Sequence, residues 1–429
     1  MNGLRVNKAK PLRGTLRPPG DKSISHRALL LAAIADGKSI IRGFLPSNDC
    51  LATLGCIRDL GVDVGKKDAT TFVVQGAGLR GLRKPQGYLD CVRSGTAMRL
   101  LVGILAGQGF ESTLTGKRQL LNRPMKRVID PLSKMGARID STMGHAPLVV
   151  TGGLLNGISF EMPIASAQLK SAVLLAGLFA DGPTTIYEPS LSRDHTERML
   201  SSMKANINIQ QHKITIAPSR LQAMSVHIPA DFSSAGFAMV AASIVPGSRI
   251  ILEGVGINPT RTGLLDVLTS MGADITPSNQ HMSGNEPVSD LTIRSAKLHG
   301  VEVAPQMVPR MIDEFPILAV GATQASGTTI ITGAKELRVK ETDRISTVVE
   351  ELSKLGAQIN AREDGFVVQG PTVLKGTSVS SHGDHRLAMA LAVAGMMAQG
   401  STQIDDIDCV ADSFPGFTGL MRELGARYD

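Results

Sequence analysis

The sequence contains no tryptophan, and aromatic residues make up only 3% of its 429 residues. It also has no long run of lysine and arginine, although its formal net charge is +7. Proteins that bind nucleic acid usually stack bases on aromatic side chains and neutralise phosphates with clustered cations. We therefore expect no nucleic-acid binding. The positive charge favours small acidic ligands instead.

Cysteines and long apolar runs are also scarce. The four cysteines, Cys50, Cys56, Cys91 and Cys409, form no Cys-x-x-Cys pair and no cluster with histidine at metal-ligand spacing. Neither a disulfide framework nor a metal site is therefore expected. The longest apolar run, around 388–398, is too short to span a bilayer, and the N-terminal residues include no apolar signal segment. We predict a cytoplasmic protein that does not enter a membrane.

Six segments of the sequence repeat one pattern. Each begins with a polar residue, continues as a stretch rich in Ala, Leu, Val and Met, and ends at glycine. Successive copies start about 70 residues apart, which is typical of a repeat architecture. Because the stretches are apolar on nearly every face, we predict helices that are buried all round. The copies are SISHRALLLAAIADG from Ser23, SGTAMRLLVGILAGQG from Ser94, SAQLKSAVLLAGLFADG from Ser166, SSAGFAMVAASIVPG from Ser233, DEFPILAVGATQASG from Asp313 and DHRLAMALAVAGMMAQG from Asp384.

A second series of segments alternates with the first. IRDLGV, LSKMGA, LSSMKA, LTSMGA, LSKLGA and MRELGA each fit the end of an amphipathic helix that leads into a short strand. A further strand follows the first five copies, whereas the sixth copy reaches the chain end. We predict an α/β (α+β) fold of two globular domains. Each domain has three repeated βαβαββ-type units, with buried parallel helices and sheets outside.

The boundary between the domains is predicted near VHIPADFSS, close to residue 228. One domain then comprises residues 19–228. The other comprises residues 229–429 together with residues 1–18, because the strand before Pro18-Pro19 needs a partner and the second domain can supply it.

Polar and charged side chains gather at the starts of the predicted helices, where free N–H groups and partial positive charge favour anions. We predict Ser23 as the N-cap of the first helix and Pro124 as the first residue of the helix after Arg123. The fourth unit offers only Asp231, Arg261 and hydroxyls. The other five carry GDKSISHR, SGTAMR with NRPMKR, SAQLKS with SRDHTE, Asp313-Glu314 with LRVKETDR, and GDHR.

A purely structural interpretation stays open for several of these groups. Residues 340–344 also fit a solvated helix start, GDHR a capped helix with a hydrogen-bonded histidine, and SRDHTE a simple cap. GDKSISHR fits that interpretation poorly, because Lys22 and Arg27 repel each other unless an anion lies between them.

Taken together and in order along the chain, GDKSISHR, SGTAMR, RPM, SAQLKS, RVKETDR and GDHR resemble the 5-enolpyruvylshikimate-3-phosphate (EPSP) synthase family. The resemblance implies the inside-out α/β barrel of the enolpyruvyl transferases. It implies transfer of the enolpyruvyl group of phosphoenolpyruvate (PEP) to the 5-hydroxyl of shikimate 3-phosphate, with release of phosphate. This is a step of the shikimate pathway toward chorismate and the aromatic amino acids. No metal or organic cofactor, a monomer, and glyphosate binding at the PEP site are also implied.

The resemblance also implies roles for individual residues. Lys22, which would touch both ligands, Asp313 and Glu341 are the expected catalytic residues, with Asp313 as base and Glu341 as acid. The expected shikimate 3-phosphate ligands are Lys22, Ser23, Arg27, Ser166, Ala167, Gln168, Ser192, Arg193, Asp313 and Lys340. The expected PEP ligands are Lys22, Gly95, Arg123, Gln168, Arg344, His385 and Arg386.

Three positions depart from the family's pattern. Val92-Arg93 stands where Gly-Asn is common, Lys117 follows Gly116 where an acidic residue is usual, and Asp412 replaces a lysine that some members carry. Because the first two changes add positive charge and the third removes it, we expect an active enzyme with altered affinity for PEP and glyphosate.

Two other functions share parts of this pattern. UDP-N-acetylglucosamine enolpyruvyl transferases have the same repeat and PEP chemistry, but they usually carry a cysteine near the Arg-Pro segment, and GKRQLLNRP has none. The second alternative is a catalytically inactive anion-binding protein on the same scaffold. Lys22, Asp313 and Glu341 argue against it.

Overall fold

The computed structural model of the chain describes residues 3–429, which divide into two compact units. Unit 1 comprises the described part of Met1–Pro19 with Pro229–Met282 and Pro287–Asp429, and unit 2 comprises Gly20–Ile228 with Ser283–Glu286. The predicted domain of residues 19–228 did not include Ser283–Glu286. This short stretch is the tip of a hairpin whose strands belong to unit 1.

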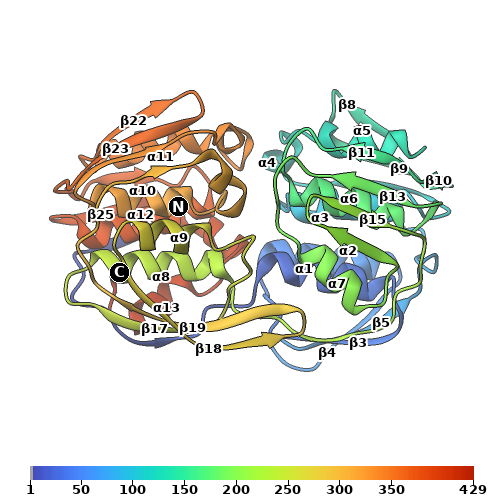
Figure 1. The fold of residues 1–429 in the computed structure, drawn as a ribbon, viewed down its shortest axis with the longest axis horizontal. Helices are drawn as coiled ribbons and strands as arrows, with labels where there is room; N and C mark the ends of the chain where they lie inside the picture. Colours follow the sequence, from blue (N-terminus) through green and yellow to red (C-terminus); the bar gives the residue numbers. More distant parts are fainter. Residues whose placement is uncertain (1–2) are drawn as a thin grey trace. The chain divides into compact units, whose positions relative to one another are not determined.

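Unit 2 contains repeats one to three (Figure 1). Repeat one consists of α1 (Lys22–Ala33), β3 (Asp36–Arg42), α2 (Asn48–Asp59), β4 (Asp63–Lys66), β5 (Phe72–Ala77) and, later in the chain, β16 (Ser225–His227). Repeat two consists of β6 (Leu89–Asp90), α3 (Gly95–Leu105), β7 (Glu111–Thr115), α4 (Arg118–Leu121), α5 (Lys126–Lys134), β8 (Arg138–Thr142) and β9 (His145–Thr151). Repeat three consists of β11 (Ser159–Glu161), α6 (Ala167–Gly177), β13 (Thr184–Tyr187), α7 (His195–Ser202), β14 (Ile207–Gln210) and β15 (Lys213–Ile216), and the short strands β10 (Leu155–Asn156) and β12 (Ala180–Asp181) pair beside it.

Unit 1 contains repeats four to six. Repeat four consists of β2 (Arg13–Leu16), α8 (Phe232–Ile244), β17 (Arg249–Gly256), α9 (Gly263–Ser270), β18 (Asp274–Ser283) and β19 (Glu286–Arg294). Repeat five consists of β20 (Glu302–Val303), η1 (Pro305–Arg310), α10 (Phe315–Thr323), β21 (Gly327–Ile331), η2 (Lys335–Val339), α11 (Arg344–Lys354), β22 (Gln358–Arg362) and β23 (Gly365–Gly370). Repeat six consists of β24 (Ser378–Ser380), α12 (His385–Met397), β25 (Ser401–Asp405), η3 (Ile407–Asp412), α13 (Phe417–Glu423), β26 (Arg427–Tyr428) and β1 (Leu4–Asn7).

Each repeat builds one four-stranded sheet on the same plan. In repeat two the order is β6-β7-β9-β8, with β6 parallel to β7 and the other neighbours antiparallel. The predicted βαβαββ unit is therefore confirmed. No sheet closes into a barrel within residues 3–429.

Three strands come from elsewhere in the sequence. β16 completes the sheet of repeat one, β2 that of repeat four, and β1 pairs with β25 and β26 of repeat six. The N-terminal strands thus pair in unit 1. β1 thus occupies a central position in the sheet of repeat six, between β25 and β26.

The first helix of each repeat is buried, as its apolar sequence predicts. Every residue of α8 is buried, and α10 contacts both α8 and α12, which also contact each other. Figure 1 shows these three helices inside unit 1, with β17–β19 and β22–β23 on outer sides. The starts of these helices are held by the same compact core, and this fixes the residues that precede them.

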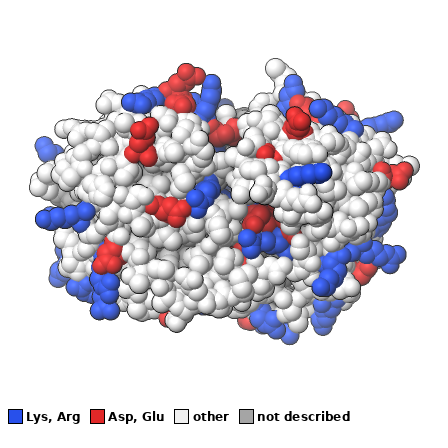
Figure 2. Space-filling view, viewed as in Figure 1, with Lys and Arg blue, Asp and Glu red and all other residues white. Residues whose placement is uncertain are grey.

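The distribution of charge on the surface agrees with the absence of a long lysine and arginine run in the sequence. Figure 2 shows acidic and basic side chains interspersed on the face viewed, and neither sign covers that face continuously. Among the described residues, none of the helices has the length and hydropathy that a bilayer crossing requires.

Candidate active site

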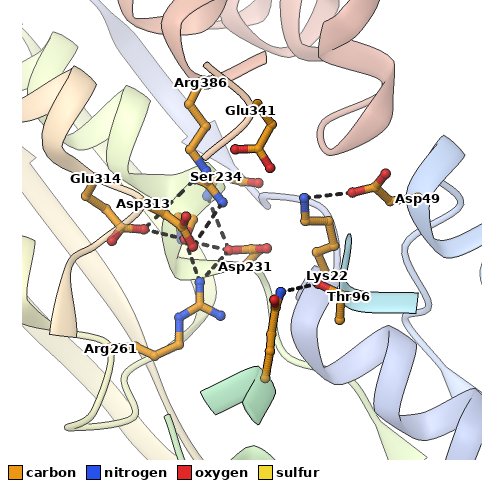
Figure 3. A network of polar contacts seen from close by, with 12 residues as sticks. Lys22, Asp49, Thr96, Asp231, Ser234, Arg261, Asp313, Glu314, Glu341 and Arg386 are labelled. Carbon is orange, nitrogen blue, oxygen red and sulfur yellow. Dashed lines mark hydrogen bonds and ion pairs between the residues drawn. The ribbon is translucent and has the colours of Figure 1, made fainter. Parts of the chain in front are cut away.

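Lys22 is the first residue of α1 and points toward a carboxylate of the next helix. Its Nζ lies 3.0 Å from Oδ2 of Asp49 on α2, as Figure 3 shows. The N-cap of α1 is Asp21, whose carboxylate accepts a hydrogen bond from the amide of Ile24 at 2.8 Å. The prediction of Ser23 as N-cap is wrong, because α1 begins at Lys22, two residues earlier than a Ser23 cap would give, and Ser23 lies in its first turn.

Arg27 is buried one turn further along α1. It donates from Nε to Oγ1 of Thr196 at 2.7 Å, from Nη2 to Oγ of Ser171 at 2.8 Å, and from Nη1 to the carbonyl of Ser23 at 2.9 Å. These contacts tie α1 to α6 and α7. Thr196 and Ser171 were not predicted, because nothing in their local sequence marks them as partners of a residue more than 100 positions away.

The turn before α3 places Gly95 against two arginines. A Cβ on Gly95 would lie 2.7 Å from Nη1 of Arg123 and 2.9 Å from Nη1 of Arg99, so a larger residue here would displace one or both guanidinium groups. Arg99 is buried and donates to Oε1 of Gln168 at 2.7 Å and to the carbonyl of Pro124 at 3.1 Å. Arg99 is thus held by carbonyl oxygens within unit 2.

Gln168 lies at the start of α6 and is oriented at both ends of its amide. Its Oε1 accepts from Arg99, and its Nε2 donates to Oγ1 of Thr96 at 2.8 Å. Ser166 is the N-cap of α6, and its hydroxyl accepts from the amide of Leu169 at 3.4 Å. The predicted residues 166–168 therefore form one helix start.

The helix that contains the NRPMKR segment starts later than predicted. α5 begins at Lys126 with Met125 as N-cap, so Pro124 is not its first residue. The amide of Met125 donates to the carbonyl of Gly144, which holds this segment against the β8–β9 turn. Arg123 is therefore half-buried in the segment that connects α4 and α5.

Arg344 is the centre of a second group, which lies in unit 1. The guanidinium is fully buried at the start of α11, and it contacts three carboxylates. Nε donates to Asp384 at 2.8 Å, Nη2 donates to Glu341 at 2.7 Å, and Nη1 lies 3.3 Å from Asp313. Burial alone would lower the pKa of Arg344, but the attraction of Asp384, Glu341 and Asp313 outweighs it and raises that pKa above the ordinary value.

Asp384 is the N-cap of α12, which begins with His385 and Arg386. Its Oδ1 accepts from the amide of Arg386 at 2.9 Å while Oδ2 accepts from Arg344. The GDHR motif is thus a capped helix, and the same carboxylate joins the cap to the arginine at the start of α11. His385 and Arg386 are both buried.

Asp313 and Glu314 join Arg386 to the fourth repeat. Arg386 lies 3.7 Å from Asp313 and 4.0 Å from Glu314. Glu314 accepts a hydrogen bond from Ser233, which also accepts from Arg261, and Arg261 lies 3.2 Å from Asp231. Figure 3 shows Asp231, Arg261, Asp313, Glu314 and Arg386 pointing toward one another. The fourth repeat has few polar residues at its helix starts, yet its Asp231 and Arg261 are part of this network.

The predicted site residues therefore form two groups in the structure. Lys22, Ser23, Arg27, Gly95, Arg123, Ser166, Ala167, Gln168, Ser192 and Arg193 belong to unit 2, and Asp313, Lys340, Glu341, Arg344, His385 and Arg386 belong to unit 1. Lys340 is half-buried at the end of η2. In each group, cations gather at or near helix starts, an arrangement suited to small anionic ligands.

Comparison with known proteins agrees with this arrangement. Residues 6–421 match the family described as EPSP synthase (3-phosphoshikimate 1-carboxyvinyltransferase). This chain belongs to the EPSP synthase family. It is 52% identical over 418 residues to the 3-phosphoshikimate 1-carboxyvinyltransferase of Geobacillus kaustophilus, covering 96% of this chain and 98% of the relative. The enzyme of the same name from Brevibacillus brevis is 47% identical over 427 residues, 98% of this chain and 99% of the relative.

The fold is also that of solved EPSP synthases. The 2.37 Å structure of EPSP synthase from Acinetobacter baumannii superposes with a TM-score of 0.89 at 41% identity, covering 100% of this chain and 99% of that one. Membership of the EPSP synthase family confirms the predicted fold class, the transferase activity and the shikimate-pathway reaction. It does not favour the UDP-N-acetylglucosamine alternative.

Val92, at the first departure from the EPSP synthase pattern, has a left-handed backbone with φ of 52°. A β-branched residue rarely adopts this conformation, at a cost of about 1–2 kcal/mol. Hydrogen bonds hold it there, because its amide donates to Asp90 at 2.8 Å and its carbonyl accepts from the amide of Lys117 at 2.6 Å. Two of the departures, at Val92 and Lys117, are therefore joined by a backbone hydrogen bond.

One group of side chains in unit 1 has the composition of a metal site. Ligand atoms of Glu350, Glu351 and His382 lie within 4.8 Å of one another. The ammonium of Lys354 already pairs with Glu350 at 2.9 Å and with Glu351 at 2.8 Å. Because this internal cation neutralises both carboxylates, we assign no metal to the group.

Proposed function

We propose that this chain transfers the enolpyruvyl group of PEP to the 5-hydroxyl of shikimate 3-phosphate. The observation that carries the proposal is the pairing of Asp313 and Glu341 with a single buried guanidinium. Their side chains are 19% and 20% exposed, whereas Arg344 is 1% exposed. Arg344 thus fixes two carboxylates that remain accessible to a ligand.

In the proposed chemistry, Asp313 removes the proton of the 5-hydroxyl while that oxygen forms a bond to C2 of PEP. Glu341 donates a proton to the methylene carbon C3, which becomes a methyl group. Phosphate then leaves C2 as one methyl proton is removed, and the carbon–carbon double bond forms again. Lys22 assists by stabilising negative charge on the reacting groups.

The proposed ligands divide by the chemistry of the two substrates. Lys22, Ser23, Arg27, Ser166, Ala167, Gln168, Ser192, Arg193, Asp313 and Lys340 bind shikimate 3-phosphate, and Lys22, Gly95, Arg123, Gln168, Arg344, His385 and Arg386 bind PEP. Arginine forks suit phosphate and carboxylate groups, and the helix starts add backbone N–H donors. PEP would compete with Asp313 and Glu341 for the outer nitrogens of Arg344, which links binding of the anion to release of the two carboxylates.

Two substitutions test the assignment of base and acid. Asp313→Asn and Glu341→Gln keep side-chain size and should each lower kcat by on the order of 10²–10⁴. Glu350→Gln on α11 is the matched control, because Glu350 is half-exposed and its carboxylate pairs with Lys354 of the same helix. The control is expected to keep the wild-type rate.

Isotope exchange separates the two roles. In D₂O the wild-type protein should place deuterium in the methylene group of the product, since C3 passes through a methyl group. Glu341→Gln should slow this incorporation as much as it slows phosphate release. Turnover near the wild-type rate in both variants would refute the assignment.

We also propose that the Arg93 departure changes inhibitor affinity. An added cation at the start of α3 alters the charge around the PEP ligands Gly95 and Arg123. Arg93→Asn should therefore change the inhibition constant of glyphosate. An unchanged constant would contradict this proposal.

Location and assembly complete the proposal. We propose a cytoplasmic monomer that acts on small molecules. The four cysteines are free and buried, as is typical of a reducing compartment. Light scattering during gel filtration should give a mass near 45.3 kDa, and twice that mass would contradict the monomer.

A further inference from the structure

Unit 2 buries three charged side chains that have no part in the proposed chemistry. Lys170 of α6 lies 2.9 Å from Glu188, which follows β13, and 2.5 Å from Glu197 of α7. Their side chains are only 1%, 1% and 2% exposed. Oε2 of Glu197 has no hydrogen-bond partner among the described residues.

Stability of the fold alone does not explain why Lys170, Glu188 and Glu197 are buried together. Removing charged groups from water is costly, and well-packed apolar side chains often replace a buried ion pair without loss of stability. Although burial alone would lower it, the attraction of Glu197 and Glu188 raises the pKa of Lys170 above its ordinary value, so the ammonium stays charged at neutral pH. One cation therefore faces two carboxylates in the interior of the unit. We infer the role of this cluster from the residues that it contacts.

The trio holds Ser192. Lys170 donates to the carbonyl of Ser192 at 3.3 Å. Glu188 accepts from the amide of Ser192 at 3.2 Å and from its hydroxyl at 2.5 Å. The amide, the carbonyl and the hydroxyl of this one residue are thus all bound by Lys170 and Glu188.

Ser192 lies in the middle of a segment without regular secondary structure. Residues 188–194 connect β13 to α7, and Ser192 is buried while Leu191 beside it is exposed. Arg193 follows directly. The hydrogen bonds to Ser192 therefore set the backbone from which the side chain of Arg193 extends.

Lys170 also belongs to the helix that carries another part of the proposed site. Its amide donates to the carbonyl of Ser166 at 2.9 Å in the first turn of α6, directly after residues 166–168. One side chain thus connects the start of α6 with the segment that contains Arg193. Both segments are proposed to bind shikimate 3-phosphate.

We propose that Lys170 and Glu188 are positioning residues for the phosphate of shikimate 3-phosphate: they fix Ser192, and Ser192 sets Arg193 against the start of α6. This inference rests on the proposed function. It gives a structural reason for the enzyme's selectivity for the phosphorylated substrate. It also changes the expected role of Ser192, whose hydroxyl donates to Glu188 and orders the loop.

The chain offers a matched pair of variants to test this. Glu188→Met and Glu197→Met each replace a buried carboxylate by an apolar side chain of similar length, and each leaves Lys170 one carboxylate. Of these two carboxylates, Glu188 is the one that accepts hydrogen bonds from Ser192. E188M should raise KM for shikimate 3-phosphate on the order of 10- to 100-fold, since misplacing a binding group by about 1 Å has effects of this size. KM for PEP should stay close to the wild-type value, and E197M should leave both constants close to wild type.

A second readout separates lost phosphate recognition from general damage. The ratio of kcat/KM for shikimate 3-phosphate to that for unphosphorylated shikimate should fall in E188M, because only the phosphorylated substrate uses Arg193. General damage would lower both values and leave the ratio unchanged. Glu188→Gln keeps one oxygen for Ser192, so its KM for shikimate 3-phosphate should lie between those of the wild type and E188M.

Thermal unfolding of all variants is measured first. If E188M does not fold, E188Q and E197Q give the same comparison with smaller perturbations, and only E188Q should raise KM for shikimate 3-phosphate. Equal effects at Glu188 and Glu197, or an unchanged substrate ratio, would overturn the inference. Phosphate release by the wild type that does not depend on shikimate 3-phosphate would instead overturn the proposed function itself.

Discussion

Replacement of Arg344 by lysine tests the centre of the unit 1 site. The substitution keeps the positive charge but removes the guanidinium group and its three separate nitrogens. The guanidinium reaches Asp384 at 2.8 Å, Glu341 at 2.7 Å and Asp313 at 3.3 Å from three different nitrogens. A lysine ammonium is a single point and cannot reach three carboxylates on separate segments. At least two charge-assisted hydrogen bonds are therefore lost.

The expected cost follows from these losses. A hydrogen bond to a charged group contributes about 1.5–3 kcal/mol, and breaking a buried ion pair costs about 3–5 kcal/mol. We expect Arg344→Lys to lower the free energy of unfolding by about 3–5 kcal/mol. Since Asp313 and Glu341 also lose their common anchor, kcat/KM for PEP should fall at least on the order of 100-fold.

Urea unfolding followed by far-ultraviolet circular dichroism measures the first effect, because the chain has no tryptophan for fluorescence. Phosphate release measures the second. Arg294→Lys is the control, since Arg294 is half-exposed and makes one 3.4 Å contact with Asp274. It should change stability by less than about 0.5 kcal/mol. A loss below about 1 kcal/mol in Arg344→Lys together with wild-type phosphate release would refute this reasoning.

Three further substitutions have defined outcomes. Gly95→Ala places a Cβ 2.7 Å from Nη1 of Arg123, so KM for PEP should rise. KM for shikimate 3-phosphate and the melting temperature should stay close to wild type. An unchanged KM for PEP would argue against this contact. Val92→Gly relieves a φ of 52° and should stabilise the fold by about 0.5–1 kcal/mol after glycine's own entropy is subtracted, and a destabilised variant would contradict the strain. Burial, together with the charges of Lys22 and Arg27, lowers the pKa of His26 well below 6.5. Below pH 6.5 the unfolded chain therefore takes up a proton that the folded chain does not. The free energy of unfolding consequently decreases as the pH is lowered. His26→Gln should therefore lose about 1.4 kcal/mol less than wild type between pH 7.5 and 5.5 in urea unfolding, and equal losses would exclude His26 as the cause.

The repeats could be predicted from the sequence because each is a local pattern. An apolar stretch such as residues 232–244 is hydrophobic on all faces wherever it is placed, so its burial in α8 follows from composition alone. Helix starts were predicted less accurately. Asp21 and Ser23 are both good N-caps, and only the backbone decides between them.

Contacts between segments that are distant in the sequence could not be predicted from local patterns. Arg344 meets Asp313 and Asp384 from two other motifs as well as Glu341 of its own motif. The family resemblance, not residue spacing, brought those motifs together. Thr196 and Asp49 were missed for the same reason, since their partners Arg27 and Lys22 belong to other helices. The Ser192 contacts required the backbone of a loop, because no periodic pattern fixes residues 188–194.

The central claim is that this chain uses PEP and shikimate 3-phosphate as its substrates. Phosphate release from PEP by the purified protein, measured separately with shikimate 3-phosphate and with UDP-N-acetylglucosamine, tests it most directly. We predict release that depends on shikimate 3-phosphate and does not occur with UDP-N-acetylglucosamine. Release with UDP-N-acetylglucosamine alone, or with neither acceptor, would contradict the claim.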